Sequence, residues 1–179
     1  MADERERFER LYREHFRAVL RFAAVRIDPE RAKDVAAETF LVAWRRLEDV
    51  PDEPRAWLLG VARKVIAGQF RSQSRRDALA ARLRATDVED TPADPASALA
   101  DRDEVLAAFA ALGERDREVL RLIAWDGLSN AEASDVLAIT RLAFAVRLHR
   151  ARRRLVGALE PESPSPAPPK RRRHADARS

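Results

Sequence analysis

Apolar side chains recur at steps of three and four residues through most of this chain, which is the spacing that places them on one face of an α-helix. The stripe nearest the start comprises Phe8, Leu11, Tyr12, His15, Val19, Phe22 and Ala23. Ala, Leu, Arg and Glu, which form helices readily, dominate the 179 residues, and Gly occurs only 5 times. The sequence therefore predicts an all-α fold and excludes a β-barrel or a β-sandwich.

Three helices are expected in the first 84 residues. The first ends before Asp28 and Pro29, where the apolar stripe stops. The second carries Val35, Thr39, Phe40, Ala43, Trp44 and Leu47. The third begins at Pro54, because a proline in the first helical turn loses no hydrogen bond, and it runs on into Arg71, Arg75 and Arg76. We expect a three-helix bundle, with room for a fourth short piece.

An acidic stretch at residues 85–97 divides the chain. It holds two prolines, four acidic residues and little that could be buried, which is typical of an exposed and flexible connector. The expected organisation is a small helical domain at 1–84, the acidic linker at 85–97, and a second helical domain at 98–159. The Pro-rich stretch at 160–179, which ends in a basic segment, is expected to be a disordered tail.

Charge is arranged in blocks. Residues 63–76 hold five basic side chains and no acid, residues 141–154 hold six arginines and no acid, and residues 86–101 hold five acids and no base. Two cationic modules held apart by an anionic tether suit a chain that meets a polyanion at two places. For one block alone, a merely solvated helix face explains the charges equally well.

Several classes of function are disfavoured by what the sequence lacks. It has no cysteine, and His15, His149 and His174 are too scattered to suggest a metal site. No catalytic motif of a hydrolase is present, so we expect neither an enzyme nor a cofactor. The acidic N-terminus and the lack of a long apolar run predict a soluble cytoplasmic protein that does not insert into a membrane.

The second domain contains the pattern of a helix-turn-helix. Two helices are marked first, one by Leu99, Leu106, Phe109 and Leu112, and one by Val119, Leu120, Leu122 and Ile123. Ser129 and Glu132 then form a capping box that starts a short helix, and Thr140 can cap a longer basic helix after a turn near Ala138. A basic second helix of this kind can enter the DNA major groove, although an ordinary helical hairpin remains the alternative.

Five motifs in series resemble the extracytoplasmic-function sigma factors of bacterial RNA polymerase. They are Asp34-Val-Ala-Ala-Glu-Thr-Phe-Leu-Val-Ala-Trp44, Arg55-Ala-Trp-Leu-Leu-Gly-Val-Ala-Arg63, Leu112-Gly-Glu-Arg-Asp-Arg-Glu-Val-Leu120, Gly127-Leu-Ser-Asn-Ala-Glu132 and Arg147-Leu-His-Arg-Ala-Arg-Arg-Arg-Leu155. The resemblance covers about residues 5–158. It implies region 2 and region 4 domains, which contact the −10 and −35 promoter elements.

The resemblance also implies roles for individual residues. Binding to the clamp of the largest polymerase subunit is implied for Asp34, Glu38, Thr39, Phe40 and Trp44, although the spacing of Trp44 favours packing over contact. Contact with −10 DNA is implied for Arg55, Arg63, Lys64, Gln69, Arg71, Arg75 and Arg76, and residues 48–54 are placed near a captured base. Contact with −35 DNA is implied for Thr140, Arg141, Arg147 and Arg150.

The function implied by the resemblance is a sigma factor that binds core polymerase and directs it to promoters. Promoter DNA and core polymerase are then the partners, and an anti-sigma factor is a frequent partner in the family. The alternative is a helix-turn-helix regulator that binds duplex DNA as a dimer without polymerase. One departure from the family pattern is Ala138, where a glycine is common in the turn.

Overall fold

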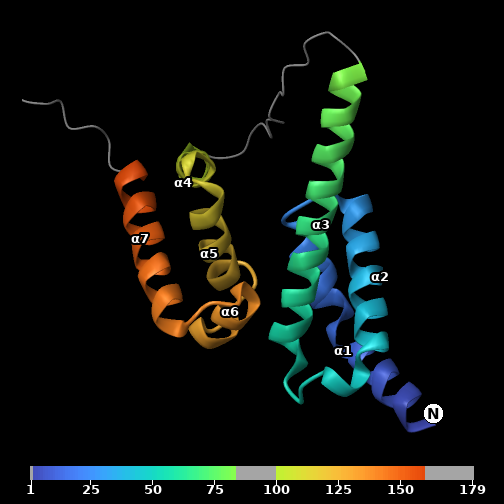
Figure 1. Cartoon of the computed structure of the whole chain (residues 1–179). Helices are drawn as coiled ribbons and strands as arrows, with labels where there is room; N and C mark the ends of the chain where they lie inside the picture. Colours follow the sequence, from blue (N-terminus) through green and yellow to red (C-terminus); the bar gives the residue numbers. More distant parts are fainter. Residues whose placement is uncertain (1, 84–99, 160–179) are drawn as a thin grey trace, which may run out of the picture.

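The computed structural model describes residues 2–83 and 100–159, and every regular element within these ranges is a helix (Figure 1). The N-terminal half contains α1 (Ala2–Ala24), α2 (Pro29–Arg45), the 3-10 turn η1 (Leu47–Asp49) and α3 (Pro54–Leu83). The C-terminal half contains α4 (Ala100–Ala111), α5 (Glu114–Ala124), α6 (Asn130–Leu137) and α7 (Arg141–Leu159). The predicted all-α class is confirmed.

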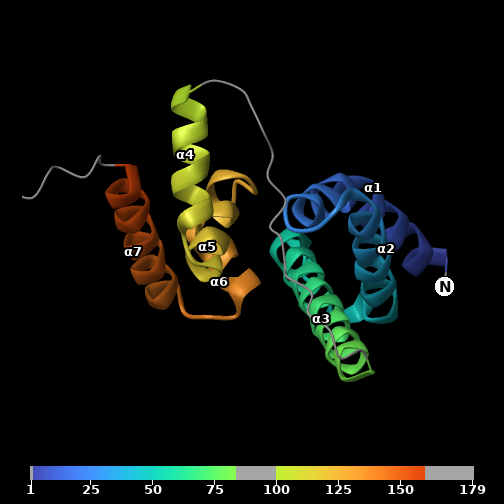
Figure 2. The same ribbon diagram turned by 90° about the horizontal axis from the view of Figure 1, so that it is seen from above.

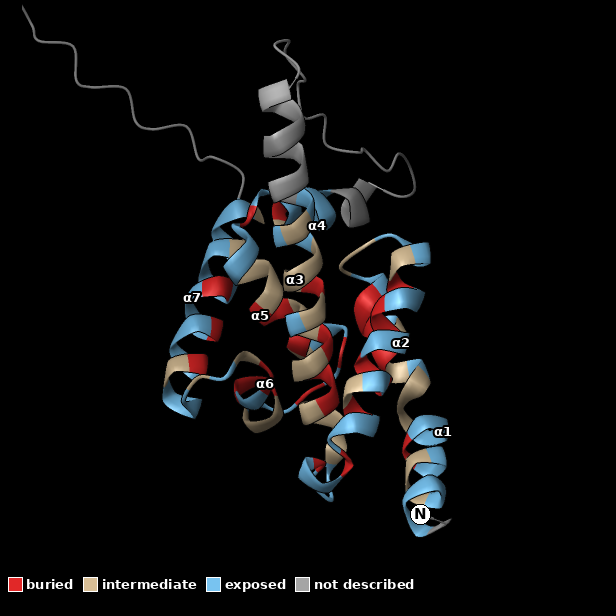
Figure 3. Cartoon of the chain, turned by 45° about the vertical axis from the view of Figure 1, so that its right-hand side comes forward, coloured by how far each residue is buried: buried red, intermediate tan, exposed pale blue. Residues whose placement is uncertain are grey.

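The helix boundaries in the N-terminal half follow local capping chemistry. Asp28 caps α2 by accepting a hydrogen bond of 3.0 Å from the backbone N–H of Arg31, and Pro29 occupies the first turn. Pro54 begins α3 in the same way. The three helices enclose fully buried side chains, and Figure 3 shows the buried residues of α2 and α3 on their inward sides. The predicted three-helix bundle, with η1 as the short extra piece, is therefore present.

The C-terminal half packs α4, α5 and α6 with α7. Leu122, Phe144 and Leu148 are buried there, and Leu155 packs against the same cluster, so the predicted inward face of α7 is confirmed. Leu106 is different, because it lies half exposed on α4 although its spacing suggested core. A four-helix group this small has too little interior to cover every apolar residue of its first helix.

The two halves are not held apart as the charge blocks suggested. α3 packs along α6, and buried residues of both halves belong to one hydrophobic cluster (Figure 2). A Cβ atom added to Gly60 would lie 3.8 Å from the Cα atom of Val136, so the two helices approach each other closely at that point. The expected linker at 85–97 and the tail at 160–179 lie outside the described residues.

The turn between α6 and α7 needs a left-handed residue, and Ala138 supplies it with φ 52° and ψ 47°. A side chain with a Cβ is strained there by about 1 kcal/mol, whereas glycine adopts this conformation freely. We expect Ala138→Gly to raise the free energy of unfolding by about 0.5 kcal/mol, since the greater freedom of unfolded glycine offsets part of the gain. Urea unfolding measures the change, and a loss of stability would contradict the strain at Ala138.

Candidate nucleic-acid interface

In the helix-turn-helix, a side-chain cap fixes the N-terminus of each of its two helices, α6 and α7. Ser129 accepts a hydrogen bond of 3.2 Å from the backbone N–H of Glu132, and the Glu132 carboxylate accepts one of 2.8 Å from the Ser129 N–H. The hydrogen bond from the Ser129 backbone, together with that from its hydroxyl, lowers the pKa of Glu132. Thr140 caps α7 by accepting 3.1 Å from the N–H of Ala143. Both predicted caps are confirmed.

The surface of α7 is exposed and cationic. The four residues implied in −35 contact all lie exposed on it or at its start, namely Thr140, Arg141, Arg147 and Arg150. Two apolar residues lie between these side chains on α7: Leu142 is 76% exposed and Val146 is 41% exposed. Apolar side chains beside arginines suit a major groove, where a thymine methyl group and guanine acceptors lie on base edges. Arg154 lies two turns after Arg147 on nearly the same face, but its guanidinium pairs with Asp116 of α5.

The exposed part of the α3 surface is also basic. Lys64 and Gln69 line a shallow surface pocket of about 420 Å³ between α2 and α3, together with Glu38. Arg71 is exposed two turns after Lys64 on α3. Arg75 and Arg76 continue the same helix, and their side chains lie outside the described set.

Two of the predicted −10 residues face the C-terminal half instead of open solvent. Arg55 donates a hydrogen bond to the backbone carbonyl of Asp126 and lies 3.9 Å from Glu132. Arg63 lines a cleft of about 650 Å³ between the halves, and Arg147 of α7 lines the same cleft. DNA contact by Arg55 and Arg63 stays a prediction, and in this conformation both side chains are partly covered because α6 packs against the face of α3 that carries them.

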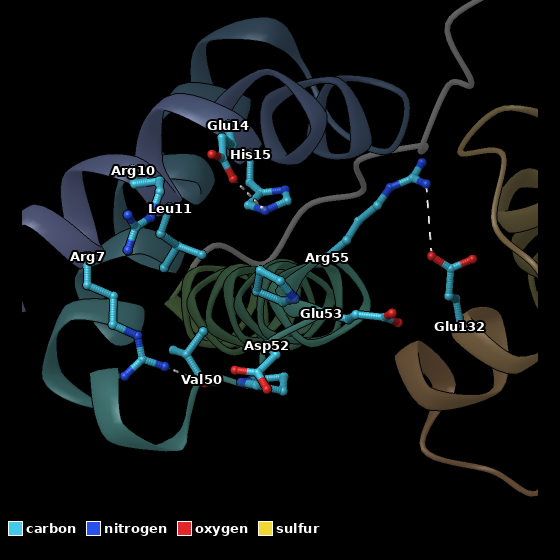
Figure 4. A pocket seen from close by; sticks show the side chains of 12 residues that line it. Arg7, Arg10, Leu11, Glu14, His15, Val50, Asp52, Glu53, Arg55 and Glu132 are labelled. Atoms are coloured by element: carbon cyan, nitrogen blue, oxygen red, sulfur yellow. Dashed lines mark hydrogen bonds and ion pairs between the residues drawn. The ribbon is translucent and has the colours of Figure 1, made fainter.

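A polar pocket lies beside the loop that precedes α3. It has a volume of about 520 Å³ and is lined by residues of α1, of the loop at 50–53 and of α6 (Figure 4). Arg7 donates a hydrogen bond of 2.8 Å to the carbonyl of Val50, which ties the loop to α1. Burial lowers the pKa of His15 in this pocket, and Arg55 acts in the same direction against Glu14. The wall of the pocket carries charges of both signs, from arginines of α1 and α3 and from carboxylates of α1, the loop and α6.

The residues of α2 that are implied in polymerase binding fall into an exposed group and a buried group. Asp34 and Glu38 are exposed, whereas Thr39 and Phe40 are buried, so those two side chains pack inside the bundle. Thr39 donates a hydrogen bond of 2.7 Å to the carbonyl of Val35. Thr39 and Phe40 follow the buried Ala36 by three and four residues, which turns both toward the core. A contact role for them stays a prediction that their burial disfavours.

Trp44 and Leu41 extend the exposed face of α2. Trp44 packs edge-on against Phe8, with ring centroids 5.0 Å apart, and still leaves 46% of its surface exposed. Leu41 is also 46% exposed and did not stand out in the sequence. Its position three residues after Glu38 on the same helix was the available signal. The exposed face of α2 therefore combines acidic and apolar side chains.

The residues that could hold a metal do not gather within the described ranges: no group of three or more His, Asp or Glu side chains is placed to bind an ion there. Across those same ranges, no helix is both long and apolar enough to cross a lipid bilayer. What the arrangement offers is two basic helical surfaces, a polar pocket and an acidic and apolar face.

Both halves of the chain match known protein families. Residues 11–76 match the family model described as Sigma-70 region 2, and residues 102–155 match the one described as Sigma-70, region 4. The ECF RNA polymerase sigma factor SigL of Mycobacterium tuberculosis is 33% identical over 150 residues, which cover 81% of this chain and 84% of SigL. The RNA polymerase sigma factor CnrH of Cupriavidus metallidurans is 34% identical over 142 residues, which cover 73% of this chain and 74% of CnrH.

Solved structures share the fold. The complex of CnrH with the cytosolic domain of CnrY aligns with a TM-score of 0.57 and 27% identity over 87% of this chain and 89% of that one. RpoE of Bartonella quintana, in complex with the anti-sigma factor NepR, aligns with a TM-score of 0.64 and 23% identity over 87% of this chain and 98% of that one. The second likeness concerns the fold alone.

A chain with a region 2 bundle followed by a region 4 helix-turn-helix is a DNA-binding transcription factor of the sigma class. This chain belongs to the sigma-70 family, in its extracytoplasmic-function group. It acts with RNA polymerase in promoter-specific transcription initiation, and the alternative of a regulator that works without polymerase is not favoured.

Proposed function

We propose that this sigma factor binds core polymerase through the exposed face of α2 and contacts the −10 and −35 elements with α3 and α7, respectively. The observation that carries the proposal is the placement of two exposed basic helix surfaces in two separate family regions. Cations along a helix face neutralise phosphates and position base-reading side chains. The site of action we expect is the cytoplasm, where polymerase and chromosome are found.

The pocket of Figure 4 is proposed to receive an unpaired base of the −10 element. Its volume of about 520 Å³ exceeds that of a single base, so a base and its sugar can enter. Arg7 and Arg10 line one wall, while Asp52 and Glu53 on the loop supply acceptors for the amino groups of a base. An unpaired base exposes its pairing edge, and those groups can read it by hydrogen bonds.

An anti-sigma factor is proposed as a further partner. CnrH and RpoE, whose structures resemble this chain, were each solved with another protein, CnrY and the anti-sigma factor NepR, respectively. The exposed aromatic and apolar residues of α1 and α2, including Tyr12, Leu41 and Trp44, offer this chain a surface for such a protein.

Transcription in vitro tests the proposed function. Purified core polymerase, with and without the full chain, is supplied with fragments of the source genome, and transcript start sites are mapped. We expect defined starts that appear only when the chain is present and that share two sequence elements upstream. Initiation that is unchanged by the chain, although circular dichroism shows that it is folded, would contradict the proposal.

The α2 face gives a prediction about core binding. Asp34, Glu38 and Leu41 are spaced by four and three residues and share one exposed face. We expect the charge reversal Glu38→Arg or the change Leu41→Arg to weaken core affinity by about tenfold to a hundredfold, as for central interface residues. Lys33→Glu is the matched control, because Lys33 is exposed elsewhere around α2. Titration of labelled chain with core measures the affinity, and equal losses in all three variants would contradict this assignment.

A further inference from the structure

Arg26 joins the two halves of the molecule. It lies in the turn between α1 and α2, and its Nε donates hydrogen bonds of 3.3 and 3.0 Å to the two carboxylate oxygens of Glu118 on α5. A terminal nitrogen of the same guanidinium donates 2.7 Å to Oδ2 of Asp126, which follows α5. We call these three residues the Arg26 cluster. Its ion pairs link positions 92 and 100 residues apart in the chain.

The Arg26 cluster is buried. The side chains of Arg26, Glu118 and Asp126 are only 6%, 14% and 3% exposed, respectively. Charges removed from water to this degree are tolerated only with close partners of opposite sign. The carbonyl of Phe22 accepts a further hydrogen bond of 2.9 Å from Arg26, whose guanidinium stacks 3.6 Å from the centre of the Phe22 ring. The N-terminal half therefore fixes the guanidinium, and the C-terminal half supplies both anions.

A second contact engages a residue proposed for the −10 element. Arg55 donates to the carbonyl of Asp126 and lies 3.9 Å from the Glu132 carboxylate, as the dashed line in Figure 4 shows. Glu132 of α6 also lines the pocket proposed for the unpaired base. In this conformation, region 4 therefore binds the Arg55 side chain and forms part of the wall of the base pocket.

The same conformation brings one residue of each basic surface to a shared cleft. Arg63 of α3 and Arg147 of α7 line one cleft of about 650 Å³, and α3 and α6 approach closely at Gly60. Two promoter elements centred about 25 base pairs apart are separated by about 85 Å along B-DNA, at about 3.4 Å for each pair. α7, with 19 residues, is only about 28 Å long. Because side chains of α3 and α7 line one cleft, the two helices lie much closer together than the two promoter elements do.

We propose that the Arg26 cluster is a latch that closes the free sigma factor on itself and withholds Arg55 and Arg63 from DNA until core polymerase draws the halves apart. The effect of the latch on DNA binding rests on the proposed function. The closed form itself is a property of the free chain. Closure is favoured by a buried ion-pair cluster and by the α3 and α6 contact. Core polymerase, by binding region 2 and region 4 separately, stabilises the open form.

A distance measurement on the free full chain tests the latch. The chain has no cysteine, so Lys33→Cys on α2 and Val156→Cys on α7 give two unique sites for spin labels. Both side chains are exposed. The distance distribution is recorded in this background for the unaltered latch, for Arg26→Ala and for the milder double change Glu118→Gln with Asp126→Asn. The control is Glu9→Gln, which removes an exposed ion pair with Arg5.

We expect one short distance in the background chain and in the control, and longer, broader distances in both latch variants. Added core polymerase is expected to lengthen the distance in the background chain. The latch variants are expected to bind a duplex with both promoter elements at least tenfold more tightly than the background chain does in the absence of polymerase.

Two results would overturn the latch. One is a short distance that persists in a latch variant whose circular dichroism spectrum shows native helix content. The other is a long distance in the unaltered free chain. If Arg26→Ala unfolds, because it leaves two buried carboxylates, the double amide variant decides between the outcomes. Transcription is measured separately. If the distances change as expected but no variant supports initiation, the latch is retained and the proposed function is rejected.

Discussion

Replacing Arg147 and Arg150 together by alanine is expected to reduce transcription from a promoter with both elements by about a hundredfold. Both arginines are exposed on α7, the longer helix of the helix-turn-helix. A side chain that pairs with a base edge contributes about 1 to 3 kcal/mol, so two such losses amount to about 3 kcal/mol or more. Transcription in vitro with saturating sigma factor measures the effect.

The affinity of the same double variant for core polymerase is the control. It is expected to be unchanged, because both side chains lie on the face of α7 that we assign to DNA. A promoter that depends on its −10 element alone is expected to lose far less activity. A fall in core affinity as large as the fall in transcription would instead assign this part of α7 to the polymerase.

Phe144→Ala is expected to lower the free energy of unfolding by about 3 to 5 kcal/mol. The ring is fully buried in the C-terminal half, so the change removes apolar contacts and leaves a cavity. A loss of this size is a large part of the total stability of a typical small protein. Urea unfolding, followed by circular dichroism, measures it. Loss of −35 recognition at physiological temperature is the expected functional consequence.

Leu142→Ala is the matched control for Phe144→Ala. Leu142 lies on the same helix, two residues earlier, and is 76% exposed. Its replacement is expected to change stability by no more than about 0.5 kcal/mol. Similar losses in the two variants would show that Phe144 does not hold the C-terminal half together. A loss of promoter binding in Leu142→Ala without a loss of stability would assign Leu142 to the DNA surface.

The local features of the fold were predictable from the sequence. Periodic apolar residues, prolines at helix starts and the capping box of Ser129 and Glu132 are each encoded within a few neighbouring residues. The resemblance to sigma factors, in which a glycine is common in this turn, pointed to Ala138, and the structure gives that residue a left-handed conformation. These predictions succeed because helix starts and ends depend on residues three or four positions apart.

The candidate site was predicted less completely. The residues that the motif on α2 singled out included Thr39 and Phe40, which the structure buries, and they did not include Leu41, which the structure exposes. A sequence motif records which residues a family uses, and packing determines which of them reach the surface. Arg26 was not singled out at all, because an arginine in a turn carries no local signal of burial.

The sequence by itself determined that this chain is helical, where most of its helices begin and end, and which basic helices can meet nucleic acid, because these depend on short-range periodicity, capping and charge. Only the tertiary structure decided that regions 2 and 4 contact each other, that Arg55 is engaged by region 4, and that Arg26 is buried between two carboxylates. Those contacts join residues up to 100 positions apart. Their free energy depends on shape and desolvation across the whole molecule, which no local pattern records.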